Sequence, residues 1–134
     1  MRVRLALAVL AVACTRTPAP SCPTGYHPDP ERSERVFRTL ARDSEARPFV
    51  DRHRASVSLC YSPRAPGVIA ERTLLLDADA DDTRLAARAA HLLLHLDRGE
   101  TSTTGHPSDP RERAALELES RVHARARGAL KHTR

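Results

Sequence analysis

The sequence predicts a small α+β domain built from three helices and a two- or three-stranded sheet. Apolar residues recur with a helical period in three segments, which we place at 30–46, 82–99 and 110–130. Between the first two segments, apolar and polar residues alternate over 55–61 and short apolar runs follow, as is typical of half-buried strands. All of these segments fall within residues 29–134, which predict one domain of ordinary size.

Residues 1–13 have the composition of an export signal. Two arginines precede an apolar run at 5–13, which is too short for a membrane-spanning helix of about 20 residues but suits a signal peptide. Ala11-Val12-Ala13-Cys14 then resembles the lipobox of bacterial lipoproteins, in which the cysteine is acylated and becomes the mature N-terminus. The resemblance implies a lipoprotein anchored through Cys14 in the bacterial cell envelope, facing the periplasm or the exterior. The alternatives are an ordinary secretory signal that is cut elsewhere and a buried apolar segment.

A proline-rich tether at 14–28 is expected between this anchor and the folded domain. With Cys14 acylated, Cys22 and Cys60 are the two cysteines that remain, and an exported protein would meet an oxidising compartment. We therefore expect a Cys22–Cys60 disulfide that pins the end of the tether to the first strand and adds on the order of 3 kcal/mol of stability. If the protein stays inside the cell, both cysteines are free thiols instead.

Capping residues justify the ends of the first and last helices. Asp29 precedes Pro30 at the start of the first helix, and Pro48 is expected to end it. Asp109-Pro110-Arg111-Glu112 places an N-cap, a first-position proline and a capping-box glutamate in register at the start of the last helix. Both helices therefore have a defined beginning.

The apolar runs at 68–70 and 73–76 are interrupted by Glu71-Arg72 and predict either one bent strand or a tight hairpin. An acidic stretch at 77–82 follows them. Its alternating aspartates suggest calcium, but the glycine and the distal glutamate of an EF-hand loop are missing. We therefore interpret the stretch as the N-terminal cap of the next helix.

The segment 82–99 is the one place where the sequence indicates chemistry. On a helical wheel its leucines and alanines form one stripe, and its arginines and histidines gather on the opposite side. His91 and His95 stand one turn apart, so both imidazoles can address one ion. We expect this pair on a solvated, arginine-rich face of the helix, with Leu92 in the core.

The spacing of the two histidines resembles the H-E-x-x-H helix of the zincin metallopeptidases, and the order of the surrounding segments resembles a zincin-like minidomain. The resemblance implies a zinc ion held by His91 and His95. In the gluzincin subgroup the third ligand is a glutamate on a later helix. By that match Glu117 would be the third ligand, with Glu119 as the alternative.

Two departures from the family argue against a working peptidase. Leu92 stands where the family has its general-base glutamate, and Arg121 stands where it has a histidine-orienting aspartate. We therefore assign no catalytic residue and favour a non-catalytic binding or structural role in the envelope. One alternative is a zinc-dependent hydrolase that uses His91, His95 and Glu117, and the other is a purely structural helical module.

Charge bears on both the cofactor and the partners. We expect zinc to bind weakly or not at all, because Arg84 and Arg88 lower the affinity of nearby imidazoles for a divalent cation. The net charge of +5 would ordinarily suggest nucleic acid, which we exclude because arginine supplies 21 of the 22 basic residues and no aromatic-rich platform for bases is present. The expected partners are the membrane, through the lipid anchor, and an envelope component that the sequence does not identify.

Overall fold

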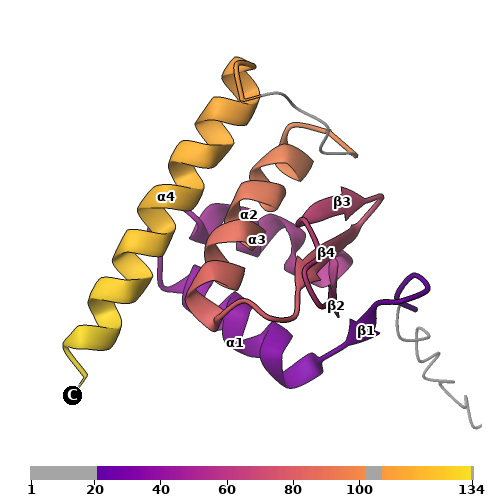
Figure 1. Ribbon diagram of the computed structural model, residues 1–134. Helices are drawn as coiled ribbons and strands as arrows, with labels where there is room; N and C mark the ends of the chain where they lie inside the picture. The colour runs from indigo at the N-terminus through magenta and orange to yellow at the C-terminus, as the bar shows by residue number, and fades with distance from the viewer. Residues whose placement is uncertain (1–20, 102–106, 134) are drawn as a thin grey trace, which may run out of the picture.

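The computed structural model describes residues 21–101 and 107–133 (Figure 1). The expected signal peptide, Cys14 and part of the tether lie outside the described residues. The elements follow one another as β1 (His27–Pro28), α1 (Pro30–Ala41), α2 (Arg47–His53), a 3-10 turn (Arg54–Ser56), β2 (Ser58–Ser62), β3 (Val68–Ala70), β4 (Thr73–Asp77), α3 (Asp82–Asp97) and α4 (Pro110–Lys131).

The predicted α+β class is confirmed, and the described residues form four α-helices and four strands, where three helices and two or three strands were expected. The additional helix arises because the segment 30–46 does not form one helix. It is broken at Asp43, whose Oδ1 accepts the N–H groups of Glu45 and Ala46, each at 3.0 Å. Pro48 then lies in the first turn of α2, where a missing N–H is tolerated. This proline therefore helps to start a helix and does not end one.

The strands form one mixed sheet in the order β1-β2-β4-β3. β2 and β4 are parallel, and β1 and β3 pair with them antiparallel at the two edges. The two predicted alternatives for this region were one bent strand and a tight hairpin. The structure has the hairpin: β3 and β4 pair antiparallel, and Glu71 lies in the turn between them with φ 56°. The strand that the sequence does not predict is β1. It is only two residues long, which is too short for an alternation of apolar and polar residues to be recognised in the sequence.

Cys22 and Cys60 form the predicted disulfide, with their Cα atoms 5.7 Å apart. Cys60 lies in β2, opposite Pro28 of β1. The bond thus fastens the described end of the tether to the sheet at the point where β1 also pairs with it.

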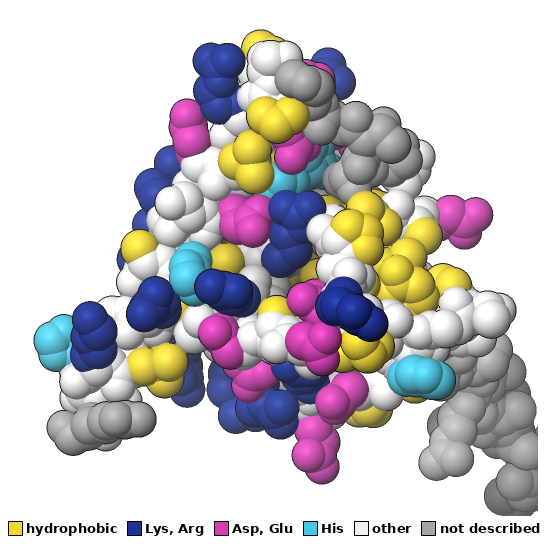
Figure 2. Space-filling view, in the orientation of Figure 1, with side chains coloured by type: hydrophobic (Ala, Val, Ile, Leu, Met, Phe, Trp, Pro, Cys, Tyr) yellow, Lys and Arg dark blue, Asp and Glu magenta, His cyan; other side chains and the backbone are white. Residues whose placement is uncertain are grey.

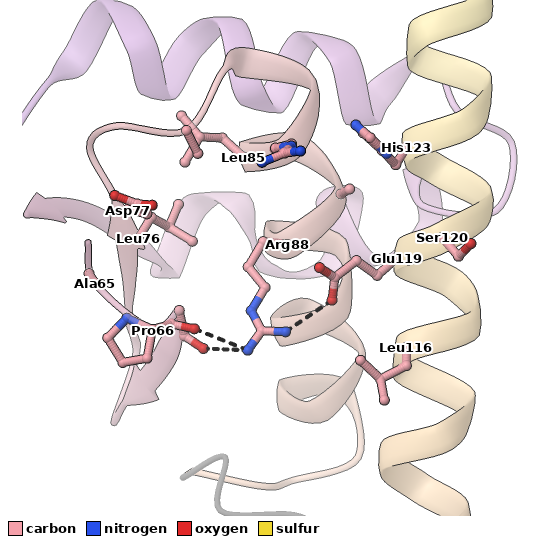
Figure 3. A pocket seen from close by; sticks show the side chains of 14 residues that line it. Ala65, Pro66, Leu76, Asp77, Leu85, Arg88, Leu116, Glu119, Ser120 and His123 are labelled. Carbon is pink, nitrogen blue, oxygen red and sulfur yellow. Dashed lines mark hydrogen bonds and ion pairs between the residues drawn. The ribbon is translucent and has the colours of Figure 1, made fainter. Parts of the chain in front are cut away.

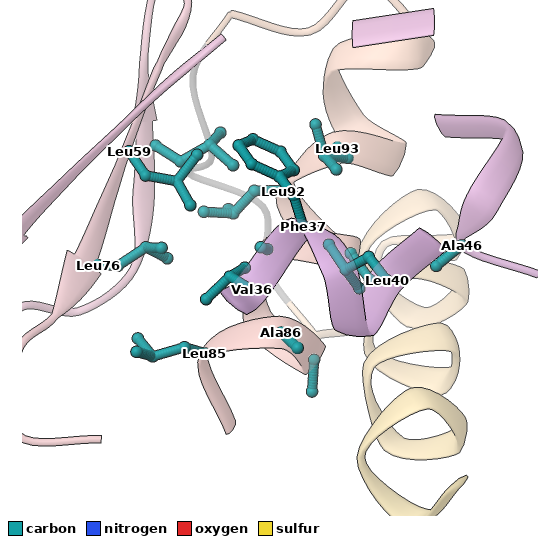
Figure 4. Packing of buried hydrophobic residues seen from close by; sticks show 14 of the residues in the cluster. Val36, Phe37, Leu40, Ala46, Leu59, Leu76, Leu85, Ala86, Leu92 and Leu93 are labelled. Atoms are coloured by element: carbon teal, nitrogen blue, oxygen red, sulfur yellow. The ribbon is translucent and has the colours of Figure 1, made fainter. Parts of the chain in front are cut away.

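α3 is the central element of the domain (Figure 1). It packs against α1, α2 and β4 and also against α4. Ten of its 16 residues are buried, so it lacks the broad solvated face that its sequence pattern predicts. Its leucines meet α1 and the sheet in one aliphatic core (Figure 4), whose members include Val36, Phe37, Leu40, Leu59, Leu74, Leu76, Leu85, Leu92 and Leu93.

α4 lies along α3 in Figure 1 and covers the face of α3 that carries the histidines. The guanidinium of Arg125 pairs with Asp43 at 2.7 Å, which ties α4 to the turn between α1 and α2. The buried residues of α4 are Glu112, Ala115, Leu118 and Val122.

No helix among the described residues is both long enough and apolar enough to cross a bilayer.

Candidate metal centre

His91 and His95 are buried between α3 and α4, with 0% and 2% of their surfaces exposed. The expectation that they lie on a solvated face is therefore wrong. The helical wheel assigns an imidazole to the polar side because the ring is polar, but it contains no information about a second helix that covers that side. Leu92 is fully buried as expected, so both faces of this turn of α3 are inside the protein.

The outer nitrogen of each ring meets a carboxylate. Nδ1 of His91 lies 2.7 Å from Oε2 of Glu119 in α4, and Nδ1 of His95 contacts Oε2 of Glu100, just after α3. An ionised carboxylate can only accept a hydrogen bond, so each Nδ1 carries the proton and donates it. In a neutral imidazole the other nitrogen, Nε2, is then an acceptor with a free lone pair.

The two Nε2 atoms face each other at 3.2 Å, and a third acceptor group joins them. Oε1 of Glu112 lies 3.2 Å from Nε2 of His91, and Oε2 lies 3.0 Å from Nε2 of His95. Oε2 of Glu112 is buried and has no hydrogen-bond partner among the described residues. Burying three converging lone-pair donors is costly unless a cation lies between them.

The spacing of these atoms suits a small divalent cation. The three groups can offer ligand atoms that all lie within 4.8 Å of one another. Tetrahedral zinc with bonds of about 2.0–2.1 Å keeps neighbouring ligand atoms about 3.3 Å apart. The two Nε2 atoms are 3.2 Å apart, close to that value, and each lies 3.0–3.2 Å from one oxygen of Glu112, Oε1 for His91 and Oε2 for His95.

Arg88 holds the outer carboxylate in place. Its Nη1 donates to Oε2 of Glu119 at 3.0 Å, and its Nη2 donates to the carbonyl oxygens of Gly67 and Pro66 at 2.9 and 3.2 Å. Burial raises the pKa of Glu119, but the hydrogen bond from His91 and the charge of Arg88 outweigh it and leave the pKa below its ordinary value. Glu119 is therefore ionised at neutral pH and is a strong acceptor for His91.

The charge of the centre also suits a divalent cation. The charged groups that contact the two imidazoles are three carboxylates, from Glu100, Glu112 and Glu119, and one guanidinium, from Arg88. A second guanidinium, that of Arg111, lies 3.4 Å from Oε1 of Glu100, so with neutral histidines one negative charge is left uncompensated. The arginine field that was expected to repel a cation is thus outweighed by carboxylates, because Arg88 is itself paired with Glu119.

The structure brings together only part of the ligand set implied by the zincin resemblance. Glu117 lies on the exposed side of α4 and is not in the group that could hold a metal. Glu119 contacts His91, but at Nδ1 and not at the nitrogen that faces the other ligands. The carboxylate in the third position is Glu112, to which the sequence pattern gave only a capping role.

A signal for Glu112 is present in the sequence. Glu112 and Glu119 are seven residues apart, which places them on one face of a helix two turns apart. Their side chains meet a histidine pair spaced by one turn on the neighbouring helix. Glu117 lies on a different face, so helical phase distinguishes it from the other two glutamates.

The arrangement can bind a metal, but the described residues hold no free general base beside it. The carboxylates of Glu100 and Glu119 are occupied by the imidazole Nδ1 atoms, and Leu92 points into the core. Arg121, at the position of the family's orienting aspartate, pairs with Glu45 at 2.8 Å and takes no part in the centre.

Comparison of the chain with protein-family models, curated proteins and solved structures found no match.

Proposed function

We propose that this chain is a zinc-binding protein of the bacterial cell envelope, in which His91, His95 and Glu112 hold the ion and the ion joins α3 to α4. One observation carries the proposal. Both imidazoles donate from Nδ1 to a carboxylate, and both Nε2 atoms converge on Glu112, whose Oε2 has no hydrogen-bond partner among the described residues. Carboxylate-oriented histidines of this kind are the usual surroundings of a protein-bound metal.

Zinc is the metal that this ligand set favours. Two imidazole nitrogens and one carboxylate form a mixed nitrogen and oxygen site, which suits zinc and other late first-row ions. Calcium and magnesium prefer oxygen ligands throughout. The H-x-x-x-H spacing on one helix and a glutamate on the next also agree with the zincin resemblance, with Glu112 in place of Glu117.

A structural or binding role is favoured over hydrolysis, because hydrolysis of a peptide at zinc needs a base to activate the bound water. Leu92 cannot serve, and the carboxylates of Glu100 and Glu119 already accept from the imidazoles. A zinc-dependent hydrolase is the second candidate. Its support is that three protein ligands among the described residues leave a fourth position for water.

The envelope location rests on the lipobox resemblance at Cys14 and on the Cys22–Cys60 disulfide, which is typical of proteins in oxidising compartments. In this proposal the acylated Cys14 is the membrane anchor, and the metal-stiffened domain stands off the membrane on its tether. Its partner is an envelope component presented to that domain.

Metal analysis tests the proposal directly. The chain is purified without added metal, and its zinc content is measured by mass spectrometry. We expect about one zinc per chain, and a large loss of zinc in Glu112→Gln, which preserves shape but removes the charge. Glu117→Gln is the matched control and should retain the metal.

Absence of zinc from the wild type, with no uptake from micromolar zinc, would overturn the proposal. An assay of the zinc-loaded chain on an unstructured protein substrate separates the two candidates. We expect no cleavage, and cleavage that disappears in Glu112→Gln but persists in Glu117→Gln would favour the hydrolase.

A further inference from the structure

We infer that a cleft beside the metal centre binds a small aliphatic carboxylate. The cleft has a volume of about 630 Å³, within the range of small-molecule sites. Residues 65–67 and the end of β4 form one wall, α4 forms the other, and α3 forms the floor (Figure 3). This inference goes beyond the proposed zinc centre and does not require a bound metal.

The acidic groups of the cleft are already engaged. Glu119 accepts from Arg88 at 3.0 Å and from His91 at 2.7 Å. Oδ1 of Asp77 accepts the backbone N–H groups of Arg64 and Asp79, at 2.7 and 3.0 Å. One oxygen of each carboxylate is therefore already satisfied within the protein, and the negative charge of Glu119 is paired with Arg88.

The basic groups of the cleft differ in whether they already have partners within the protein. Arg88 is occupied by Glu119 and by the carbonyl oxygens of Pro66 and Gly67. In contrast, the side chains of Arg84 and His123 line the cleft and form no hydrogen bond or ion pair within the described part of the chain. The donors left for a ligand are thus a permanent cation and an imidazole, which favours an anion.

These two donors lie at the same end of the cleft. Arg88 and Glu119 touch where α3 and α4 pass each other, and the helices run antiparallel. Arg84 is one turn before Arg88, and His123 is one turn after Glu119, so both lie on the same side of that contact. Figure 3 shows His123 at the end near Leu85. In the space-filling view of Figure 2, basic, acidic and histidine side chains lie close together on the face turned toward the viewer.

The far end of the cleft offers apolar surface, beyond the ion pair of Arg88 and Glu119. Leu116, which is 37% exposed, lies at the opposite end from His123 in Figure 3, and Pro66 lies on the facing wall. A ligand held by its anionic group at Arg84 would lay an aliphatic chain along these residues. One permanent positive charge matches a monoanion, so a carboxylate suits the site.

Binding of hexanoate to the purified full-length chain tests the inference, with hexanol as the uncharged control. Titration followed by NMR or calorimetry should show saturable binding of hexanoate and much weaker binding of hexanol. Arg84→Gln should weaken hexanoate binding by about tenfold, because a charge-assisted contact is lost. His123→Leu should weaken it as well.

Arg127→Gln is the matched control, since it removes the same charge from an exposed position of α4 that does not line the cleft. Hexanoate that binds no better than hexanol, or that is weakened equally by Arg127→Gln and Arg84→Gln, would overturn the inference. Zinc content is measured on the same samples and should be unchanged in Arg84→Gln. The hexanoate titration therefore tests the cleft, and the zinc content of the same samples tests the metal centre independently.

Discussion

His91 donates its Nδ1–H to Glu119 across the contact between α3 and α4, with the two atoms 2.7 Å apart. Because this bond determines which nitrogen carries the proton, it also determines that Nε2 is the atom presented to Glu112 and His95. A carboxylate on one helix thus orients a metal-binding ring on another. The following predictions test this relationship and the packing that makes it possible.

Glu119→Gln should weaken zinc binding by about 10–100-fold, because the amide is a poorer acceptor for His91 and no longer favours the required tautomer. Competition with a chromophoric chelator measures the affinity. Ser120→Ala, an exposed neighbour on α4, is the control and should bind like the wild type. Equal affinity in Glu119→Gln and the wild type would show that this carboxylate does not orient the ring.

Removal of the metal should destabilise the domain, because a ligand bound only by the folded state adds its binding free energy to folding. Free zinc at 100 times its dissociation constant would contribute about 2.7 kcal/mol. Thermal unfolding of the zinc-loaded and the chelator-treated chain measures the difference. In Glu112→Gln the two melting temperatures should coincide, and a shift of wild-type size in that variant would contradict the ligand assignment.

Leu92→Ala should cost about 2–5 kcal/mol of unfolding free energy, because the side chain is fully buried in the aliphatic core. Urea unfolding measures the loss. Leu130→Ala is the control, since Leu130 is 59% exposed and should change stability by less than about 0.5 kcal/mol. Leu92→Glu should unfold the domain and should not create a peptidase, because it places a carboxylate in that core.

Stability should fall in acid partly through Asp43. Burial raises the pKa of this carboxyl, but hydrogen bonds from Arg125 and from the N–H groups of Ala46 and Glu45 outweigh burial and leave the pKa below its ordinary value. The unfolded chain therefore takes up the proton first. The contribution of Asp43 is fully present above its unfolded pKa of about 3.9 and disappears as the pH falls through its lower folded pKa.

Asp43→Asn should lower the unfolding free energy near neutral pH by about 1–2 kcal/mol and should flatten its decline below about pH 4. Urea unfolding at a series of pH values measures both effects. Asp51→Asn, at an exposed ion pair with Arg47, is the control and should leave the pH profile close to that of the wild type. An unchanged profile in Asp43→Asn would exclude this carboxyl as the source of the acid sensitivity.

Cys14→Ser should release the protein from the membrane fraction, because the variant lacks the thiol that carries the proposed acyl anchor. Fractionation of cells that express the wild type and the variant checks this expectation. Wild-type protein found wholly in the soluble fraction would contradict the lipoprotein assignment. Labelling of free thiols in the same fractions should leave Cys22 and Cys60 unmodified until a reductant is added.

Several features of this protein follow from its sequence alone, because each depends on neighbouring residues or on counting. Asp109 and Pro110 mark the start of α4 through local hydrogen bonding and a missing N–H. Alternation along the chain indicates β2, and two cysteines besides Cys14 leave one possible internal pair. The α+β class and the one-turn spacing of His91 and His95 also follow from the sequence alone.

The tertiary structure decided which way the histidines face and which glutamate meets them. A helical wheel separates polar from apolar residues, and it assigns a buried imidazole and a solvated arginine to the same side. Whether Glu112 or Glu117 reaches His91 and His95 depends on how α4 is rotated about its own axis as it packs on α3. That rotation is set by the burial of Ala115, Leu118 and Val122 against residues distant in sequence, so no local pattern contains it.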